Sequence, residues 1–204
     1  GLLLSVNNSE LNLLKIVSHA VEQMSEGELL QIEKARKLDI KEEIYYEIIR
    51  KKTASLIASC CASGASSVGA SDEVVEKMRL FGEKVGLAFQ IKDDLFDFGL
   101  DDVGKPVGND IKEKKMTLPL IFALNETSTS QKRNIIKLVK NHSDNPEKVA
   151  EVIQFVRSSG GLDYATNKML QFQQEAFAIL DEFPDNEYKL GLQQLVKFTT
   201  ERNK

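Results

Sequence analysis

The sequence predicts an all-α protein, and three observations support this fold class. Apolar residues recur with a period close to 3.6 along almost the whole chain, and no stretch alternates in the way a half-buried strand does. Residues that cap or break helices separate these periodic stretches. Of the 204 residues, 42% are hydrophobic, which is enough for a sizeable core and argues against general disorder.

The first half of the chain contains long helical stretches. The predicted helices cover residues 9–25, 28–37, 41–64 and 71–98. Ser9 and Ser71 are the expected N-caps, because a hydroxyl can accept a hydrogen bond from a free backbone N–H in the first turn. Gly27 is expected to break or bend the first helix, since glycine is a poor helix former.

A glycine-rich loop and a series of shorter helices make up the second half. Residues 99–110 include three glycines and one proline, a composition typical of a loop. The helices expected after it cover residues 117–124, 130–141, 146–158, 162–182 and 186–202. No linker is long or biased enough to divide the chain, so we expect a single domain.

Composition excludes several classes of function. With 27 Lys and Arg against 31 Asp and Glu, the chain lacks the basic face of a non-specific nucleic-acid binder. No apolar run approaches the 18 residues of a membrane-spanning helix, and the first residues, which resemble a cut end, form no secretory signal. Cys60 and Cys61 are adjacent, which suggests reduced thiols in the cytoplasm. His19 and His142 suggest neither a zinc site nor a catalytic triad.

The segment over residues 86–97 carries acidic residues on a mostly apolar helix. At 100° per residue, an arc of roughly 100° contains Gly86, Phe89, Gln90, Asp93 and Asp97, with Asp94 just outside it. A helix that is apolar over most of its surface should be buried, so it brings carboxylates into or beside the interior. Oxygen ligands without Cys or His favour Mg²⁺, which is often shared with substrate phosphates. A solvated acidic helix end is the alternative.

Lysines near this segment suggest an anionic ligand. Lys52 and Thr53 lie in an apolar helix stripe that also contains Tyr45, Ile49, Leu56 and Cys60. Lys52 and Thr53 therefore need an anionic or hydrogen-bonding partner, unless the Lys52 side chain extends along the stripe to water. A second polar group follows the acidic helix and contains Lys105, Asp110, Lys112, Lys114 and Lys115. It is either part of a polyanion site or an ordinary solvated face.

Several ordered motifs resemble the trans-type (E) polyprenyl diphosphate synthases. Asp93-Asp94-Leu95-Phe96-Asp97, preceded by Phe89-Gln90, is similar to the second aspartate-rich motif of that family. The other similar segments are residues 27–31, 51–54, 104–110, 115–119 and 198–204. Lys114 stands where the family usually has glycine, and the loop between Asp97 and Lys105 is slightly short.

The resemblance implies a fold and an incomplete site. We expect an isoprenoid-synthase-type bundle of antiparallel helices around a central cavity, truncated at the N-terminus, with residues 1–204 forming the C-terminal part of a single domain. The first aspartate-rich motif of the family belongs upstream of Gly1. Part of the metal site would therefore lie outside this sequence, and we expect this chain alone to be inactive.

The resemblance also implies Mg²⁺-dependent condensation of isopentenyl diphosphate with an allylic diphosphate, head to tail. The residues that it implies as metal ligands are Asp93, Asp94 and Asp97, and those that would contact the diphosphate are Lys52, Lys105 and Lys115. Thr53 and Gln90 would hold the substrate and the nascent cation, and Phe89 would line the cavity or core. Asp93, Lys52 and Lys115 would carry the catalysis, and Glu28 and Gln31 are weaker candidates. More than one Mg²⁺ ion, a homodimer and transient membrane contact are further implications.

Two other classes of function stay open. A non-catalytic regulatory subunit of a heteromeric prenyl synthase is one, although intact Asp93, Lys52 and Lys115 argue against it. A helical interaction scaffold is the other, and it would bind no diphosphate. The sequence determines neither the length of the product nor the preferred allylic substrate.

Overall fold

The computed structural model describes residues 2–35, 38, 41–99 and 107–202, and every regular element within these ranges is a helix. The elements are α1 (Leu2–Asn7), α2 (Leu11–Ala35), α3 (Glu42–Ile49), η1 (Arg50–Ala54), α4 (Ser55–Ser67), α5 (Asp72–Phe96), α6 (Asn109–Lys112), α7 (Leu118–Asn125), α8 (Thr129–Asn141), α9 (Pro146–Ser158), α10 (Gly161–Asp181) and α11 (Glu187–Glu201). The predicted all-α fold class is confirmed.

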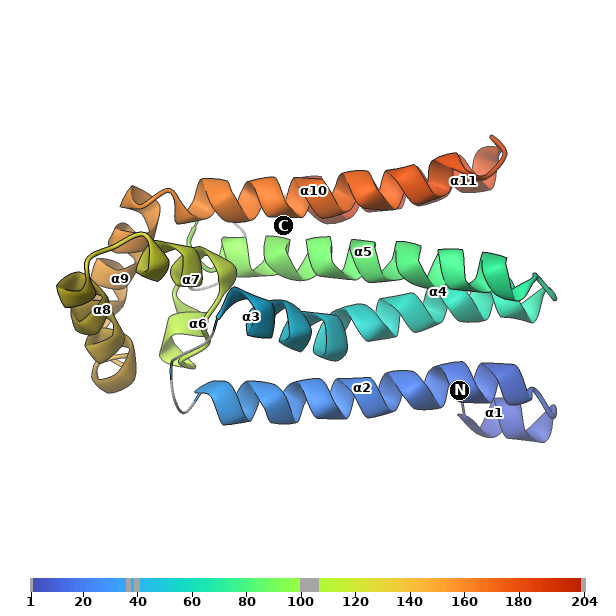
Figure 1. Ribbon diagram of the computed structural model, residues 1–204, viewed down its shortest axis with the longest axis horizontal. Helices are drawn as coiled ribbons and strands as arrows, with labels where there is room; N and C mark the ends of the chain where they lie inside the picture. The colour runs from blue at the N-terminus through green and yellow to red at the C-terminus, as the bar shows by residue number, and fades with distance from the viewer. Residues whose placement is uncertain (1, 36–37, 39–40, 100–106, 203–204) are drawn as a thin grey trace.

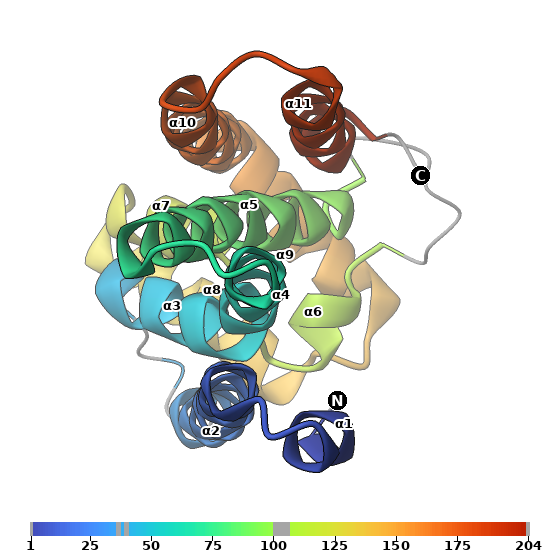
Figure 2. The ribbon, with the colours of Figure 1, turned by 90° about the vertical axis from the view of Figure 1, so that its right-hand side faces the viewer.

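Long helices run side by side in layers (Figure 1). Seen end-on, α5 lies in the middle, with α10 and α11 on one side and α3, α4 and then α2 on the other (Figure 2). The shorter helices α6 to α9 gather at the end where α5 finishes (Figure 1). Leu87, Ala88 and Ile91 of α5 are completely buried in the main core, so the helix that carries the acidic motif is central to the bundle.

The predicted break at Gly27 is wrong. Helix α2 runs without interruption from Leu11 to Ala35, and Gly27 is buried within it. A Cβ atom at Gly27 would lie 2.6 Å from the backbone nitrogen of Lys52, so glycine is required there for close packing rather than for a bend. Ser9 is not the expected N-cap either, because it adopts a left-handed backbone conformation with φ of 59°.

The stretch predicted as one helix over residues 41–64 is divided by a π-helical turn, η1, which contains Lys52 and Thr53. Glycine in α5 permits close contact with this turn, since a Cβ on Gly86 would lie 2.5 Å from the Cα of Ala54. A π-turn changes the angular position of the residues that follow it. Leu56, placed in the buried stripe by the sequence, is accordingly 47% exposed.

The other predicted helices differ from the observed ones by a residue or two at most. Ser71 caps α5 by accepting a hydrogen bond from the backbone N–H of Val74, and α9 has the predicted bounds. The sequence prediction omitted α1 and the single turn α6. Most of the predicted loop, residues 100–106, lies outside the described residues. Within the described ranges, no helix has both the length and the apolar character needed to cross a membrane.

Candidate active site

A cavity of about 220 Å³ opens where α2, α3, η1 and α5 meet the segment around α6. Its lining mixes apolar and ionisable side chains, namely Gln31, Ala35, Tyr45, Ile48, Ile49, Lys52, Thr53, Gln90, Asp93, Asp94, Asp110, Lys115, Met116 and Thr117. Residues separated by more than 80 positions in the chain therefore line the same cavity.

Most of the site residues named from the sequence meet at this cavity. Lys52, Thr53, Gln90, Asp93, Asp94 and Lys115 all line it. Asp97 and Phe89 do not line it, and Lys105 lies outside the described residues. Tyr45 and Asp110 also line the cavity, although no sequence pattern gave either of them a specific role in the site.

Asp93 lies at the rim of the cavity, with 38% of its side chain exposed. Nη2 of Arg202 is 3.7 Å from Oδ1 of Asp93. The Arg202 guanidinium also stacks on Phe89, 4.4 Å from its ring centroid, and lies 5.2 Å from that of Phe96. Sequence reasoning assigned Arg202 no role, because no local pattern shows that the end of α11 reaches the acidic motif.

Asp94 is enclosed rather than presented to solvent. It is 5% exposed, and its two carboxylate oxygens accept hydrogen bonds from the Tyr45 hydroxyl at 2.7 Å and the Gln90 amide at 2.9 Å. Burial, and then the negative charge of Asp110, raises the pKa of Asp94 to about 7. Both carboxylate oxygens of Asp94 are thus hydrogen-bonded to protein donors, and its role as a metal ligand stays a prediction.

Asp97 links the end of α5 to α6. Its carboxylate accepts hydrogen bonds from the backbone N–H groups of Asn109, at 2.7 Å, and Asp110, at 3.1 Å. Burial and the charge of Asp110 raise the pKa of Asp97 to about 6. The sequence placed Asp97 beside Asp93 on one helix face, and its metal role also stays a prediction. In the structure it holds Asp110 close to the cavity.

Two lysines face the cavity from different elements, and each is held by acceptors. Nζ of Lys52 is 2.5 Å from a Glu28 oxygen and 3.2 Å from the Gln31 amide oxygen. Nζ of Lys115 is 2.7 Å from Glu113 and 3.1 Å from Asp110. Burial would lower the pKa of Lys115, but the hydrogen bond to Glu113 and the charge of Asp110 outweigh it and raise that pKa, so this group stays charged at neutral pH.

The donor set suits a hard cation that is shared with a ligand. Burial and the negative charge of Asp110 raise the pKa values of Asp94 and Asp97, so positive charge nearby would stabilise the ionised forms of these two carboxyl groups. Among the residues that the structure describes, no three acidic, His or Cys side chains form a metal cage. Mg²⁺ commonly keeps water and phosphate oxygens in its shell, so a site with few protein carboxylates is compatible with this ion.

Comparison with known proteins shows the family. The polyprenyl synthetase family profile matches residues 2–156 of the chain. The chain belongs to this family. A short chain isoprenyl diphosphate synthase of Methanothermobacter thermautotrophicus is 34% identical over 191 residues, which are 93% of this chain and 58% of that protein.

Solved structures of polyprenyl synthases share the fold. A geranylgeranyl pyrophosphate synthase from Bacteroides thetaiotaomicron is 39% identical with a TM-score of 0.85, over 93% of this chain and 63% of that one. A polyprenyl synthase from Caulobacter crescentus, complexed with calcium and isoprenyl diphosphate, is 30% identical with a TM-score of 0.90, over 98% and 62% of the two chains. The chain thus spans about three-fifths of the length of these relatives.

Proposed function

We propose that the complete protein containing this chain is a polyprenyl diphosphate synthase. The observation that supports the proposal best is the meeting of Lys52, Lys115 and Asp93 around one cavity. Ammonium groups on two walls can hold the non-bridging oxygens of a diphosphate, and a carboxylate at the rim can hold the cation that binds the same oxygens. The family membership of the chain agrees with this chemistry.

The proposed reaction breaks the C–O bond of an allylic diphosphate, and the electron pair leaves with pyrophosphate. The double bond of isopentenyl diphosphate then forms a C–C bond to the allylic cation. The new carbocation loses a proton to form a double bond, which leaves a prenyl diphosphate five carbons longer. When bound, Mg²⁺ would neutralise the negative charge that develops on the leaving pyrophosphate. Lys52 and Lys115 do the same from the protein, because they are already oriented by Glu28, Glu113 and Asp110.

Thr53 and Gln90 present oxygen atoms near the position proposed for the cation. The Thr53 hydroxyl donates to the Gln90 amide oxygen at 2.8 Å, so the lone pairs of Thr53 remain available. Buried apolar groups beside them, Ile48 and Ile49, limit the access of water. A cation that forms there would be stabilised by acceptors and protected from hydrolysis.

The finer points belong to the same proposal. We expect more than one Mg²⁺ ion, held partly by residues outside this sequence, so that the isolated 204-residue chain forms no product. A homodimer, transient membrane contact through a long product and a cytoplasmic location are further expectations. Lys105 would complete the diphosphate contacts.

Calorimetry on the complete protein tests this function. A bisphosphonate should bind only with Mg²⁺ present, and the same preparation should convert isopentenyl and allylic diphosphates to a longer product. Binding without turnover would favour the regulatory subunit of a heteromeric synthase instead. Absence of both binding and turnover would contradict the proposal and leave a helical scaffold as the better explanation.

A further inference from the structure

A chain of hydrogen bonds connects Tyr45 to Thr53 along the wall of the cavity. The Tyr45 hydroxyl donates to Oδ2 of Asp94, and Nε2 of Gln90 donates to Oδ1 of the same carboxylate. The Thr53 hydroxyl then donates to Oε1 of Gln90 at 2.8 Å. The four residues come from α3, η1 and α5, so the chain ties together elements that the backbone alone would not orient.

The direction of these bonds determines what the cavity presents to a ligand. Asp94 accepts from both neighbours, so the nitrogen of the Gln90 amide must face Asp94 and its oxygen must face Thr53. The proton of Thr53 points to that oxygen. Thr53 and Gln90 therefore direct acceptor lone pairs at the cavity, which is the polarity that a developing cation requires.

Burial makes this orientation persistent. Tyr45 is 4% and Asp94 5% exposed, so water cannot easily replace the phenol as the second donor to the carboxylate. Without that donor, one oxygen of Asp94 would lack a partner in a poorly solvated place. The carboxylate could then rotate, and the Gln90 amide with it.

We propose that Tyr45 and Asp94 are positioning residues, which orient Gln90 and Thr53 so that both present oxygen atoms to the reacting carbon. This inference rests on the proposed prenyl transfer. Tyr45 and Asp94 act through their neighbours, so they should affect the rate of ionisation and condensation more than the binding of either diphosphate.

Replacement of Tyr45 by Phe in the complete protein tests the proposal. Tyr45→Phe keeps the ring and removes the donor, and we expect kcat to fall about tenfold with both KM values within about twofold of wild type. Tyr46→Phe is the matched control. Its ring packs against Tyr45 and Phe172, but its hydroxyl takes no part in the chain of hydrogen bonds from Tyr45 to Thr53, so its kcat should be unchanged.

A double-mutant cycle separates positioning from general destabilisation. In a Gln90→Ala background, Tyr45→Phe should cause no further loss of kcat, since the group that it orients is gone. Asp94→Asn should lower kcat without raising the Mg²⁺ concentration for half-maximal rate. Additive losses, equal effects of the two tyrosine variants, or a raised Mg²⁺ requirement in Asp94→Asn would overturn the proposal.

Failure of the proposed function would look different. An inactive wild-type protein would refute prenyl transfer, and the positioning role would then be judged from a crystal structure of Tyr45→Phe. Loss of the Thr53–Gln90 hydrogen bond in that structure would support the positioning role. An unaltered Thr53–Gln90 hydrogen bond would exclude the positioning role.

Discussion

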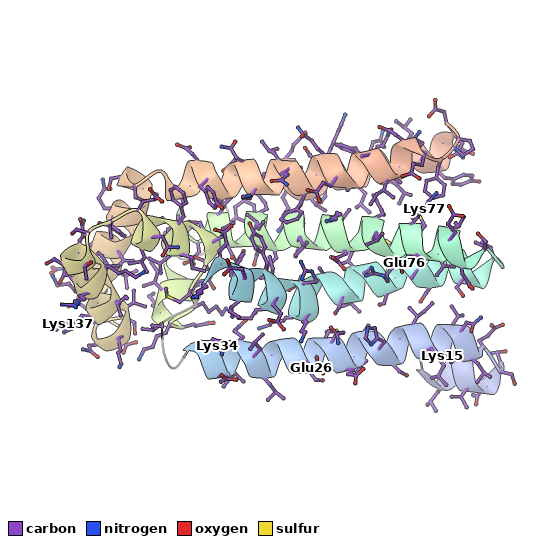
Figure 3. The ribbon with its side chains drawn as sticks, in the orientation of Figure 1. Lys15, Glu26, Lys34, Glu76, Lys77 and Lys137 are labelled. Carbon is purple, nitrogen blue, oxygen red and sulfur yellow. The ribbon has the colours of Figure 1, made fainter. Side chains whose placement is uncertain are left out.

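The two halves of α5 carry similar acidic residues in opposite electrostatic situations. In the first half, Arg79 lies 2.8 Å from both Glu76 oxygens and 2.9 Å from Glu83, so these pairs form within one helix. Glu76 and Lys77 of this half are labelled in Figure 3. Hydrogen bonding to Arg79 lowers the pKa of Glu76. In the second half, burial raises the pKa of Asp94 and Asp97.

This difference shows how to tell a solvated acidic face from a binding site. Carboxylates that find cations three or four residues away need no ligand, and such exposed pairs contribute little to stability. No Lys or Arg stands three or four residues from Asp93, Asp94 or Asp97 in the sequence. Their compensating charges come from Lys115 and Arg202, far away in sequence. Carboxylates beside a cavity whose compensating charges do not come from their own helix are therefore the useful signal.

The largest expected effect is on catalysis by the second half of α5. Asp93→Ala in the complete protein should lower kcat by about 10²–10³-fold, because the rim carboxylate that we propose as a ligand of the cation is lost. Its melting temperature should change little, since Asp93 is partly exposed. Glu76→Ala on the same helix is the control and should keep full activity in steady-state kinetics. Near-normal turnover of Asp93→Ala would remove Asp93 from the metal site.

The pH dependence of stability should also separate the two halves. The pKa of Asp94 is raised from 3.8 to about 7 in the folded protein, so the folded state binds the proton more tightly than the unfolded state. Its contribution to stability is complete below pH 4 and is lost as the pH rises through about 7. Each unit of pKa shift is worth about 1.4 kcal/mol, so the loss is on the order of a few kcal/mol.

Urea denaturation of Asp94→Asn between pH 5 and pH 8 measures this effect. The free energy of unfolding of the variant, relative to wild type, should increase with pH, because the wild type alone loses the stabilising proton. Glu76→Gln, at a carboxylate whose pKa is lowered, should show a small change of opposite sign. Parallel pH profiles of wild type and Asp94→Asn would mean that Asp94 titrates normally.

Neighbouring lysines offer the next comparison. Lys52→Ala should raise the KM of the allylic substrate about tenfold, as expected for the loss of one charge-assisted phosphate contact. Lys51 pairs with Glu26 and Glu47 instead and does not line the cavity, so Lys51→Ala should leave that KM unaltered. Equal KM values for the two variants would place Lys52 outside the substrate site.

The smallest effect concerns the glycine behind Lys52. Gly27→Ala would place a Cβ 2.6 Å from the Lys52 backbone nitrogen, and overpacking of this kind costs about 1–3 kcal/mol. Gly64→Ala in α4, where no atom lies within 4 Å of the added Cβ, should instead stabilise the helix by about 0.5–1 kcal/mol. Thermal denaturation compares them, and equal melting temperatures would contradict the close approach of α2 and η1.

Local patterns were sufficient to predict most of the helices and the acidic motif. Hydrophobic period and capping hydroxyls are properties of neighbouring residues, so α5 with its Ser71 cap and α9 could be located in advance. Gly27 was misjudged because helix propensity describes an isolated helix, whereas its role depends on the distance to η1. The π-turn was missed for a similar reason, since it is stabilised by packing between helices.

Which polar groups meet was decided by the tertiary structure alone. The residue types of Lys52, Gln90 and Asp93 indicated a diphosphate site from motif and spacing, and the fold brought them to one cavity. Tyr45 and Asp110 line that cavity from two other parts of the chain, and Arg202 approaches Asp93 from a third. Burial and charge at a site are sums over spatial neighbours, and those neighbours exist only once α3, α6 and α11 have packed around the end of α5.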